Sequence, residues 1–192
     1  IFGHKQSGHI TTVGFQMYCD LLSIEIQKTK SESGSVQKTP QVTTSFQPDI
    51  SSDYIENMSL RIDYYYRVGS VTSLKQLNKI EKELIDVFGP IPDKTEKLLL
   101  VASLKIKYKP TPVSQIDIQD SVLKIIVQSF DEEEQLVFLS RVGIYKHKTL
   151  ESVRFKEVSG GLLGVFLNVS GSGDVFDLLF DFVHLFDPIN TA

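Results

Sequence analysis

The sequence predicts an α+β fold in which helices come first, a small antiparallel sheet follows and a helix lies at the C-terminal end. Between residues 58 and 108, apolar residues recur every three to four positions, which is the period of amphipathic helices. In four short runs between residues 113 and 169 the period falls to two, which is typical of strands. Helices and antiparallel strands in separate stretches predict a single compact α+β domain.

Three helices are predicted in the first part of this domain, over residues 58–71, 74–88 and 93–108. The middle helix has the clearest signals, because Ser73 is a favourable N-cap and Gly89, followed by proline, is a common helix end. Its apolar residues have the spacing of one buried face: Leu74, Leu77, Ile80, Leu84 and Phe88.

Five short strands and two more helices are predicted for the rest of the domain. The strands are expected at residues 42–46, 113–119, 122–128, 153–158 and 162–169. One helix is expected at residues 131–142, where acidic residues in the first turn suit the helix dipole. The last helix is expected over residues 175–186, with apolar residues on one side and aspartates on the other.

Two further segments are expected before this domain. Residues 1–30 contain a loop and then an amphipathic helix. Residues 31–40 are polar and poor in bulky side chains, which predicts a flexible linker. Residues 41–192 then form the α+β domain. The chain begins with Ile1 rather than methionine, so we expect it to be cut from a longer protein.

The composition excludes several classes of protein. The 192 residues include 20 basic and 24 acidic side chains, a net charge of −4, which argues against a stand-alone nucleic-acid binder. No apolar run approaches the roughly 20 residues that cross a bilayer, so no membrane partner is expected. Cys19 is the only cysteine and cannot form an internal disulfide, which indicates a reducing, cytoplasmic compartment.

Motifs for catalysis and cofactor binding are absent from the sequence. It contains no phosphate loop, HExxH, GxSxG, CxxC or dinucleotide fingerprint. The four histidines are scattered, which argues against a zinc site, and the acidic run at residues 131–134 lacks the alternating ligands of a calcium loop. We therefore expect no catalytic residue, cofactor or metal in this chain, which would act as a monomeric binding module.

Three blocks of the sequence resemble the C-terminal end of bacterial transcription-repair coupling factor. Residues 3–22, GHKQSGHITTVGFQMYCDLL, resemble the end of the family's translocase motor and its exit helix. Residues 60–67, LRIDYYYR, are similar to the family's LRLxFYxR helix. Residues 83–93, ELIDVFGPIPD, are similar to its ELIDRFGxLPD segment. Order and spacing also agree over residues 1–110, and beyond them only the order of elements agrees.

The resemblance implies a function for the chain and for its parent. In that family the whole protein is an ATP-driven double-stranded DNA translocase, with ATP and magnesium as cofactors. It pushes stalled RNA polymerase off a lesion and recruits the excision-repair damage-recognition protein. By resemblance, this chain lacks the ATPase lobes and keeps the tail of the motor and the C-terminal regulatory domain. That domain is expected to dock on the N-terminal repair-helicase-like module of the same protein and to restrain it.

Glu83 and Asp86 of the third block are the candidate docking residues. At 100° per residue they lie about 100° and 160° from Leu84, the centre of the buried face, so both are expected on the solvent side of the helix. Lys79 and Lys82 beside them are alternative, local partners. The resemblance favours docking, because the acidic positions of this block are expected to meet arginines of the N-terminal module.

Gln6 is the candidate motor-coupling residue. It lies in KQSG, which resembles a glutamine loop shared with RecG-type branched-DNA translocases, where the loop couples motor movement to DNA. The alternative is a plain polar loop, and the arginine-bearing part of the motif is absent, so Gln6 would act only in the parent. A RecG-like helicase tail is the rival identity for the chain, but that resemblance ends near the exit helix.

Arg61 and Arg67 flank the three tyrosines at residues 64–66. Arginines among aromatic rings can stack on nucleic-acid bases. We favour the other interpretation, in which both residues bridge the core and the helix surface and Arg67 pairs with a carboxylate. Val87 stands where the family has an arginine, so this chain departs from the family's pattern by at least one polar group of the expected docking interface.

Overall fold

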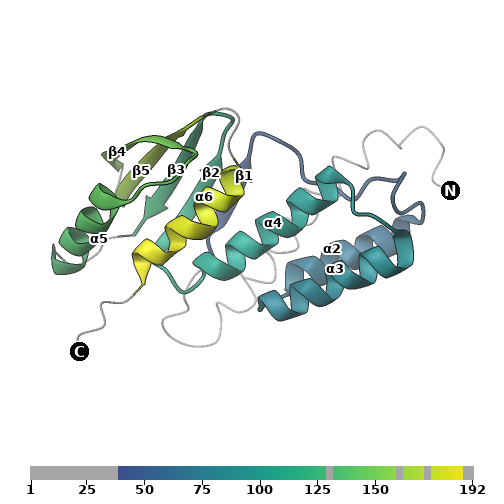
Figure 1. Cartoon of the computed structure of the whole chain (residues 1–192). Helices are drawn as coiled ribbons and strands as arrows, with labels where there is room; N and C mark the ends of the chain where they lie inside the picture. Colours follow the sequence, from purple (N-terminus) through teal and green to yellow (C-terminus); the bar gives the residue numbers. More distant parts are fainter. Residues whose placement is uncertain (1–38, 129–131, 159–161, 171–173, 188–192) are drawn as a thin grey trace, which may run out of the picture. The chain divides into compact units, whose positions relative to one another are not determined.

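The computed structural model describes residues 39–128, 132–158, 162–170 and 174–187 (Figure 1). Their backbone contacts group into two compact units, one over residues 46–106 and one over the described parts of 39–45 and 107–187. Within the described residues, five α-helices and a five-stranded sheet confirm the predicted α+β fold. The predicted boundaries at residues 30 and 40 fall outside or at the edge of the described residues and stay predictions.

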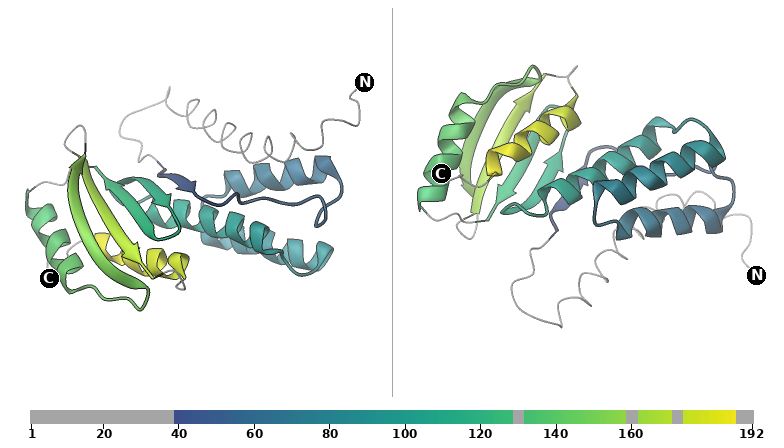
Figure 2. Two further views of the ribbon diagram at one scale, coloured as in Figure 1. Left: turned by 90° about the horizontal axis from the view of Figure 1, so that it is seen from above. Right: turned by 60° about the horizontal axis from the view of Figure 1, so that its bottom comes forward.

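The first unit is built from α2 (Met58–Ser70), α3 (Leu74–Phe88) and α4 (Asp93–Tyr108), whose last two residues belong to the second unit (Figure 2). Tyr64 and Tyr65 of α2 are buried. Their rings fill the core of the unit, so packing overrides the strand propensity of the tyrosine run. The other large buried residues of this core are Ile50, Ile55, Val68, Leu77, Ile80, Leu84, Leu98 and Leu99.

Caps set the ends of α2 and α3 where the sequence predicts them. Asn57 Oδ1 and Ser73 Oγ each accept a hydrogen bond from the backbone N–H three residues further on, at 3.1 and 3.4 Å. Gly89 ends α3 with φ of 85°, and its N–H donates to the carbonyl oxygen of Ile85 at 2.9 Å. Glycine adopts this backbone conformation without the strain of other residues. The third sequence block, residues 83–93, therefore spans the last turns of α3, the turn that starts at Gly89 and the first residue of α4.

The second unit is a sheet with helices α5 (Glu132–Ile144) and α6 (Val175–Phe182), followed by the 3-10 helix η1 (Val183–Phe186). The strands, in their order across the sheet, are β1 (Gln41–Thr44), β2 (Val113–Ile118), β3 (Val122–Val127), β5 (Leu162–Val169) and β4 (Leu150–Val158). Neighbouring strands are antiparallel except β1 and β2, which are parallel. The sheet is mostly antiparallel, as predicted, and β1 adds one parallel edge pair, because a long connection separates it from β2 and permits parallel pairing.

Aromatic rings hold α5, α6 and η1 together in the second unit, where α6 lies across the sheet (Figure 1). Phe138 of α5 stacks on Phe186 of η1 with ring centroids 4.7 Å apart. Buried Tyr108 donates its hydroxyl to the carbonyl oxygen of Leu179 at 2.7 Å. This side of the sheet is the core of the unit, because buried aromatic and aliphatic side chains contribute most to its stability.

Candidate docking face on helix α3

Glu83, the first candidate docking residue, is bound by two residues of α2. Its carboxylate accepts hydrogen bonds from both terminal guanidinium nitrogens of Arg67, at 2.7 and 2.5 Å, and from the Tyr64 hydroxyl at 2.9 Å. The Arg67 guanidinium also lies over the Tyr64 ring, 4.8 Å from its centroid. Because a bidentate arginine–carboxylate pair is strong and geometrically specific, Glu83 joins α3 to α2.

This ion pair changes the pKa values of all three side chains. Hydrogen bonds from Arg67 and then from Tyr64 lower the pKa of the Glu83 carboxyl from 4.5 to about 2. The hydrogen bonds with Glu83 raise the pKa of Arg67. Burial, and then the hydrogen bond to Glu83, raises the pKa of the Tyr64 hydroxyl. Glu83 is therefore ionised at neutral pH and already has a positive partner within its own unit.

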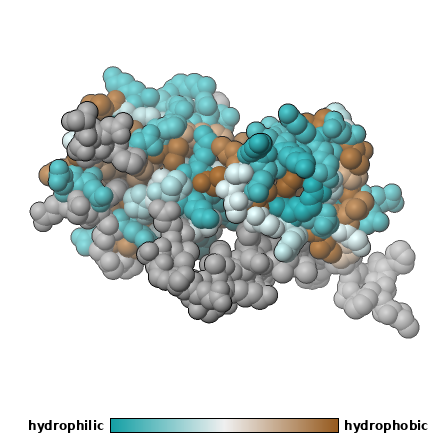
Figure 3. Space-filling model, turned by 90° about the horizontal axis from the view of Figure 1, so that it is seen from below, coloured by the Kyte–Doolittle hydropathy of each residue, from teal (hydrophilic) through white to brown (hydrophobic). Residues whose placement is uncertain are grey.

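Asp86, the second candidate docking residue, lies one turn further along α3 and is exposed. Within the described part of the chain its carboxylate has no hydrogen-bond or ion-pair partner. Its neighbours Ile85 and Val87 are 46% and 62% exposed. On the face of the molecule that Figure 3 displays, apolar residues are scattered among hydrophilic ones. An unpaired charge beside exposed apolar side chains suits a docking partner of opposite charge.

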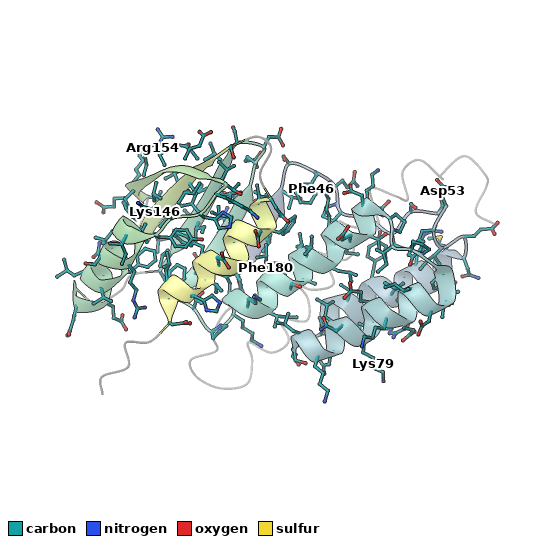
Figure 4. All side chains as sticks on the ribbon, viewed as in Figure 1. Phe46, Asp53, Lys79, Lys146, Arg154 and Phe180 are labelled. Carbon is teal, nitrogen blue, oxygen red and sulfur yellow. The ribbon has the colours of Figure 1, made fainter. Side chains whose placement is uncertain are left out.

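The structure corrects the expectation that both carboxylates lie free on the solvent side of α3. Glu83 binds residues of α2, which its angular position on α3 alone does not reveal. Of the two carboxylates, Asp86 is the one without a partner among the described residues. The predicted local partners, Lys79 and Lys82, form no ion pair among the described residues. Lys79 points away from the helix pair (Figure 4). The carboxylate partner predicted for Arg67 is confirmed, and it is Glu83.

The apolar stripe predicted for α3 is buried in its centre and open at its ends. Leu84 is fully buried, as expected beneath the two carboxylates. Phe88 is half-buried and meets the rings of Tyr54 and Tyr64 edge-on, at centroid distances of 5.9 and 5.8 Å. Leu74, in the first turn, is 36% exposed. Aromatic contacts thus anchor the C-terminal end of α3, on which Asp86 lies.

Arg61 lies at the N-terminal end of α2. Arg61 donates to the two backbone carbonyl groups of Ile55 and Glu56, at 2.6 and 2.8 Å, and fixes the entry into α2. The interpretation of Arg61 and Arg67 as bridging residues is therefore confirmed. Gln6 lies outside the described residues, and its motor-coupling role stays a prediction.

His147 lies in a polar cluster that the sequence did not predict. Its Nε2 is 3.6 Å from an Asp177 oxygen and 3.7 Å from an Asp181 oxygen. Its Nδ1 accepts a hydrogen bond from the Thr149 N–H at 3.2 Å. In the neutral ring the proton then sits on Nε2, which is unavailable to a metal. Among the described residues no cluster of three or more ligands suits a metal ion, and no helix is long and apolar enough to span a membrane.

Known proteins with similar sequences are transcription-repair-coupling factors. Residues 44–136 match the family described as TRCF domain. The transcription-repair-coupling factor of Haemophilus influenzae is 30% identical over 122 residues, and that of Escherichia coli is 34% identical over 113 residues. These matches cover 61% and 55% of this chain but only 11% and 10% of the relatives. The chain thus spans about a tenth of the length of these relatives.

A solved structure shares the fold. It is described as the crystal structure of the C-terminal domain of transcription-repair coupling factor, and it matches with a TM-score of 0.62 and 18% identity. The match covers 80% of this chain and 93% of that one. Together with the relatives, it confirms the resemblance to the C-terminal part of this family that the three sequence blocks predict.

Proposed function

We propose, from the resemblance of this chain to the C-terminal part of transcription-repair-coupling factor, that it is a regulatory domain of such a protein. The domain would act by docking on the N-terminal repair-helicase-like module of the same chain. Docking would hide the surface of that module that recruits the excision-repair damage-recognition protein. The observation that carries this proposal is the exposed, unpaired Asp86 in the ELIDVFGPIPD block of a TRCF domain.

The activity of the whole protein belongs to the same proposal. We propose that the parent is a cytoplasmic, ATP-dependent translocase on double-stranded DNA that displaces stalled RNA polymerase. In this chain we propose no catalytic residue, because the sequence has no nucleotide-binding motif. ATP and magnesium would bind elsewhere in the parent. Gln6 would couple the motor to DNA there, and residues 1–30, 31–40 and 41–192 would be motor tail, linker and regulatory domain.

The different contacts of Glu83 and Asp86 support different tasks for these two candidate docking carboxylates. Asp86 is free to meet an arginine of the N-terminal module directly. Glu83 has three hydrogen-bond donors already, and a carboxylate has room for about four. Glu83 can therefore accept one more donor, or exchange Arg67 for an arginine of the partner. We infer that Asp86 supplies most of the electrostatic part of docking and that Glu83 keeps α3 in place beneath it.

The test is to titrate the N-terminal module with this chain by calorimetry and to replace Asp86→Ala. Close charge pairs at interfaces couple by roughly 1.5 kcal/mol or more, so the Kd should rise about tenfold. The free energy of unfolding should change by less than about 0.5 kcal/mol, because Asp86 has no partner among the described residues. In the full-length protein the same substitution should raise the affinity for the damage-recognition protein.

A matched control is Glu81→Ala. Glu81 is exposed on α3, carries the same charge and lies about 140° away from Asp86 around the helix. This variant should dock as tightly as the unchanged chain, and so should Lys79→Ala combined with Lys82→Ala. The docking proposal fails if Asp86→Ala binds the module as tightly as Glu81→Ala does. The rival proposal of a RecG-like motor tail predicts no binding to the module at all.

A further inference from the structure

The sheet of the second unit has one face covered by helices and one open face. Along β3 and β5, the residues that point to the helix side are fully buried: Leu123, Ile125, Val165 and Leu167. On the opposite side of the described strands, only Ile126 and Gly164 are buried. We call this second side the open face, and the residues of β4 that belong to it are Ser152, Arg154, Lys156 and Val158.

Charge is distributed unequally between the two sides. The open face carries three cations, Lys124, Arg154 and Lys156, and Asp117 is the only acid among the residues that the strand register of the described sheet places on it. Acidic residues of the unit gather instead on the helices: Glu133, Glu134, Asp177 and Asp181. The second unit is therefore basic on its open face, although the chain as a whole has a net charge of −4.

The cations of the open face are available to a ligand. Lys156 has no ion-pair or hydrogen-bond partner in the described part of the chain. Arg154 has one hydrogen bond, to Asn168 Oδ1 at 3.2 Å, and no carboxylate partner there. Lys124 lies 3.5 Å from Asp117 and keeps 35% of its side chain exposed. Partly exposed pairs of this kind contribute little and exchange readily.

An aromatic ring lies among these cations. Phe166 of β5 is the direct cross-strand partner of Lys124 on β3 and of Arg154 on β4, so the three side chains form one row across the sheet. Gly164 gives the ring room, because a Cβ at that position would be 3.0 Å from Phe166 Cε2 and 3.1 Å from the Lys156 carbonyl oxygen. Phe166 is half-buried, and it makes no ring–ring contact among the described residues.

From this arrangement we propose that the open face binds single-stranded nucleic acid, with a base stacked on Phe166 and phosphates held by Arg154 and Lys156. An aromatic ring flanked by cations on a sheet is a platform for unpaired bases. Duplex DNA fits less well, because its bases are already paired and stacked. The site does not depend on the docking proposal, since Asp86 belongs to the other unit.

The experiment uses the full 192-residue chain and a fluorescein-labelled oligothymidylate, with binding followed by anisotropy. A length of about 12 nucleotides spans a site of this size. At about 50 mM salt we expect a Kd in the micromolar range, typical of a site with few phosphate contacts. A duplex of the same length should bind more weakly.

Two pairs of variants test the two parts of the site. Phe166→Leu should raise the Kd about tenfold, because it removes one stacked base. Its control is Phe155→Leu, which changes a 41% exposed ring on β4 that points to the helix side of the sheet. Arg154→Gln combined with Lys156→Gln should lower the slope of log K against log salt by about 1.4. Lys75→Gln combined with Lys79→Gln on α3 makes the same charge change elsewhere and should leave the slope unaltered.

Three results would overturn the proposal. The first is no binding of the oligonucleotide at about 100 µM protein, the weak end of non-specific affinity. The second is an equal effect of Phe166→Leu and Phe155→Leu, which would exclude stacking. The third is displacement of the oligonucleotide by polyglutamate as effectively as by unlabelled oligonucleotide, which would make the face a general anion surface that favours an acidic protein. Circular dichroism of each variant separates these results from loss of the fold.

Discussion

Arg67 in the first unit and Arg154 in the second are held in opposite ways. Arg67 makes a bidentate pair with Glu83, and its guanidinium covers the Tyr64 ring. Arg154 makes one hydrogen bond, to an amide oxygen, and has no carboxylate partner in the described part of the chain. One arginine thus completes the packing between two helices, whereas the other remains available to a ligand.

This difference shows that the side chains on the neighbouring helix or strand decide whether an arginine forms an ion pair within the fold. On α3, a carboxylate lies opposite the last turn of α2, and the pair satisfies itself within the unit. On β4, the open-face neighbours across the strand are Phe166 and Asn168, neither of which neutralises a cation. A charged side chain that has no partner of opposite charge within the fold can interact with an oppositely charged ligand.

The largest effect on stability should come from breaking the Arg67 pair. Arg67→Met keeps the length of the side chain but leaves the half-buried Glu83 carboxylate without its main partner. We expect the free energy of unfolding of the first unit to fall by about 1–2 kcal/mol. This is the contribution of a hydrogen-bonded charge pair, lowered because solvent screens a partly exposed pair. Hydrogen exchange of the α2 and α3 amides in a urea series measures this loss.

The matching control combines Arg67→Met with Glu83→Gln. With both charges removed, no unpaired carboxylate remains, so the double variant should be less destabilised than the sum of the two single variants. Simple additivity of the two substitutions would mean that the pair does not couple α2 to α3.

A second, smaller effect is expected in acid. The folded-state pKa of Glu83 is lowered from 4.5 to about 2, so its contribution to stability is fully present above pH 4.5. That contribution is lost as the pH falls toward about 2, because the unfolded chain then binds the proton more readily than the folded one. Acid unfolding of the Glu83→Gln variant should show a shallower pH dependence over this range. An unchanged acid profile would show that other carboxyl groups dominate it.

The smallest effect on stability is expected for Arg154→Met. This residue has no charged partner among the described residues, so the free energy of unfolding of the second unit should change by less than about 0.5 kcal/mol. Thermal unfolding measured by calorimetry, with Arg67→Met alongside, gives the comparison directly. A loss as large as that of Arg67→Met would place Arg154 in the packing of the sheet rather than on a binding surface.

Much of the secondary structure could be predicted from the sequence. The bounds of α3 follow from Ser73 and Gly89, which act within one turn of the helix ends. The runs at residues 122–128 and 162–169 likewise predicted the positions of β3 and β5. The parallel partner of β1 could not be predicted, because the period of a strand carries no information on the direction of its neighbour. The predicted start of β4, at residue 153, was too late, because the strand begins at Leu150. A register shift between Leu150 and Ser152 breaks the alternation at its first residues.

The sequence by itself determined the helix and strand pattern, the overall charge and the resemblance of the ELIDVFGPIPD block, because each of these depends on residues close together in the chain. Only the tertiary structure decided which of the two carboxylates has a partner among the described residues. Glu83 and Asp86 are three residues apart in the chain. Arg67, 16 residues before Glu83, binds the Glu83 carboxylate and does not bind that of Asp86. The row of Lys124, Phe166 and Arg154 likewise exists only because three strands are aligned in register. Side-chain contacts between elements depend on how the elements pack, and no local pattern encodes that packing.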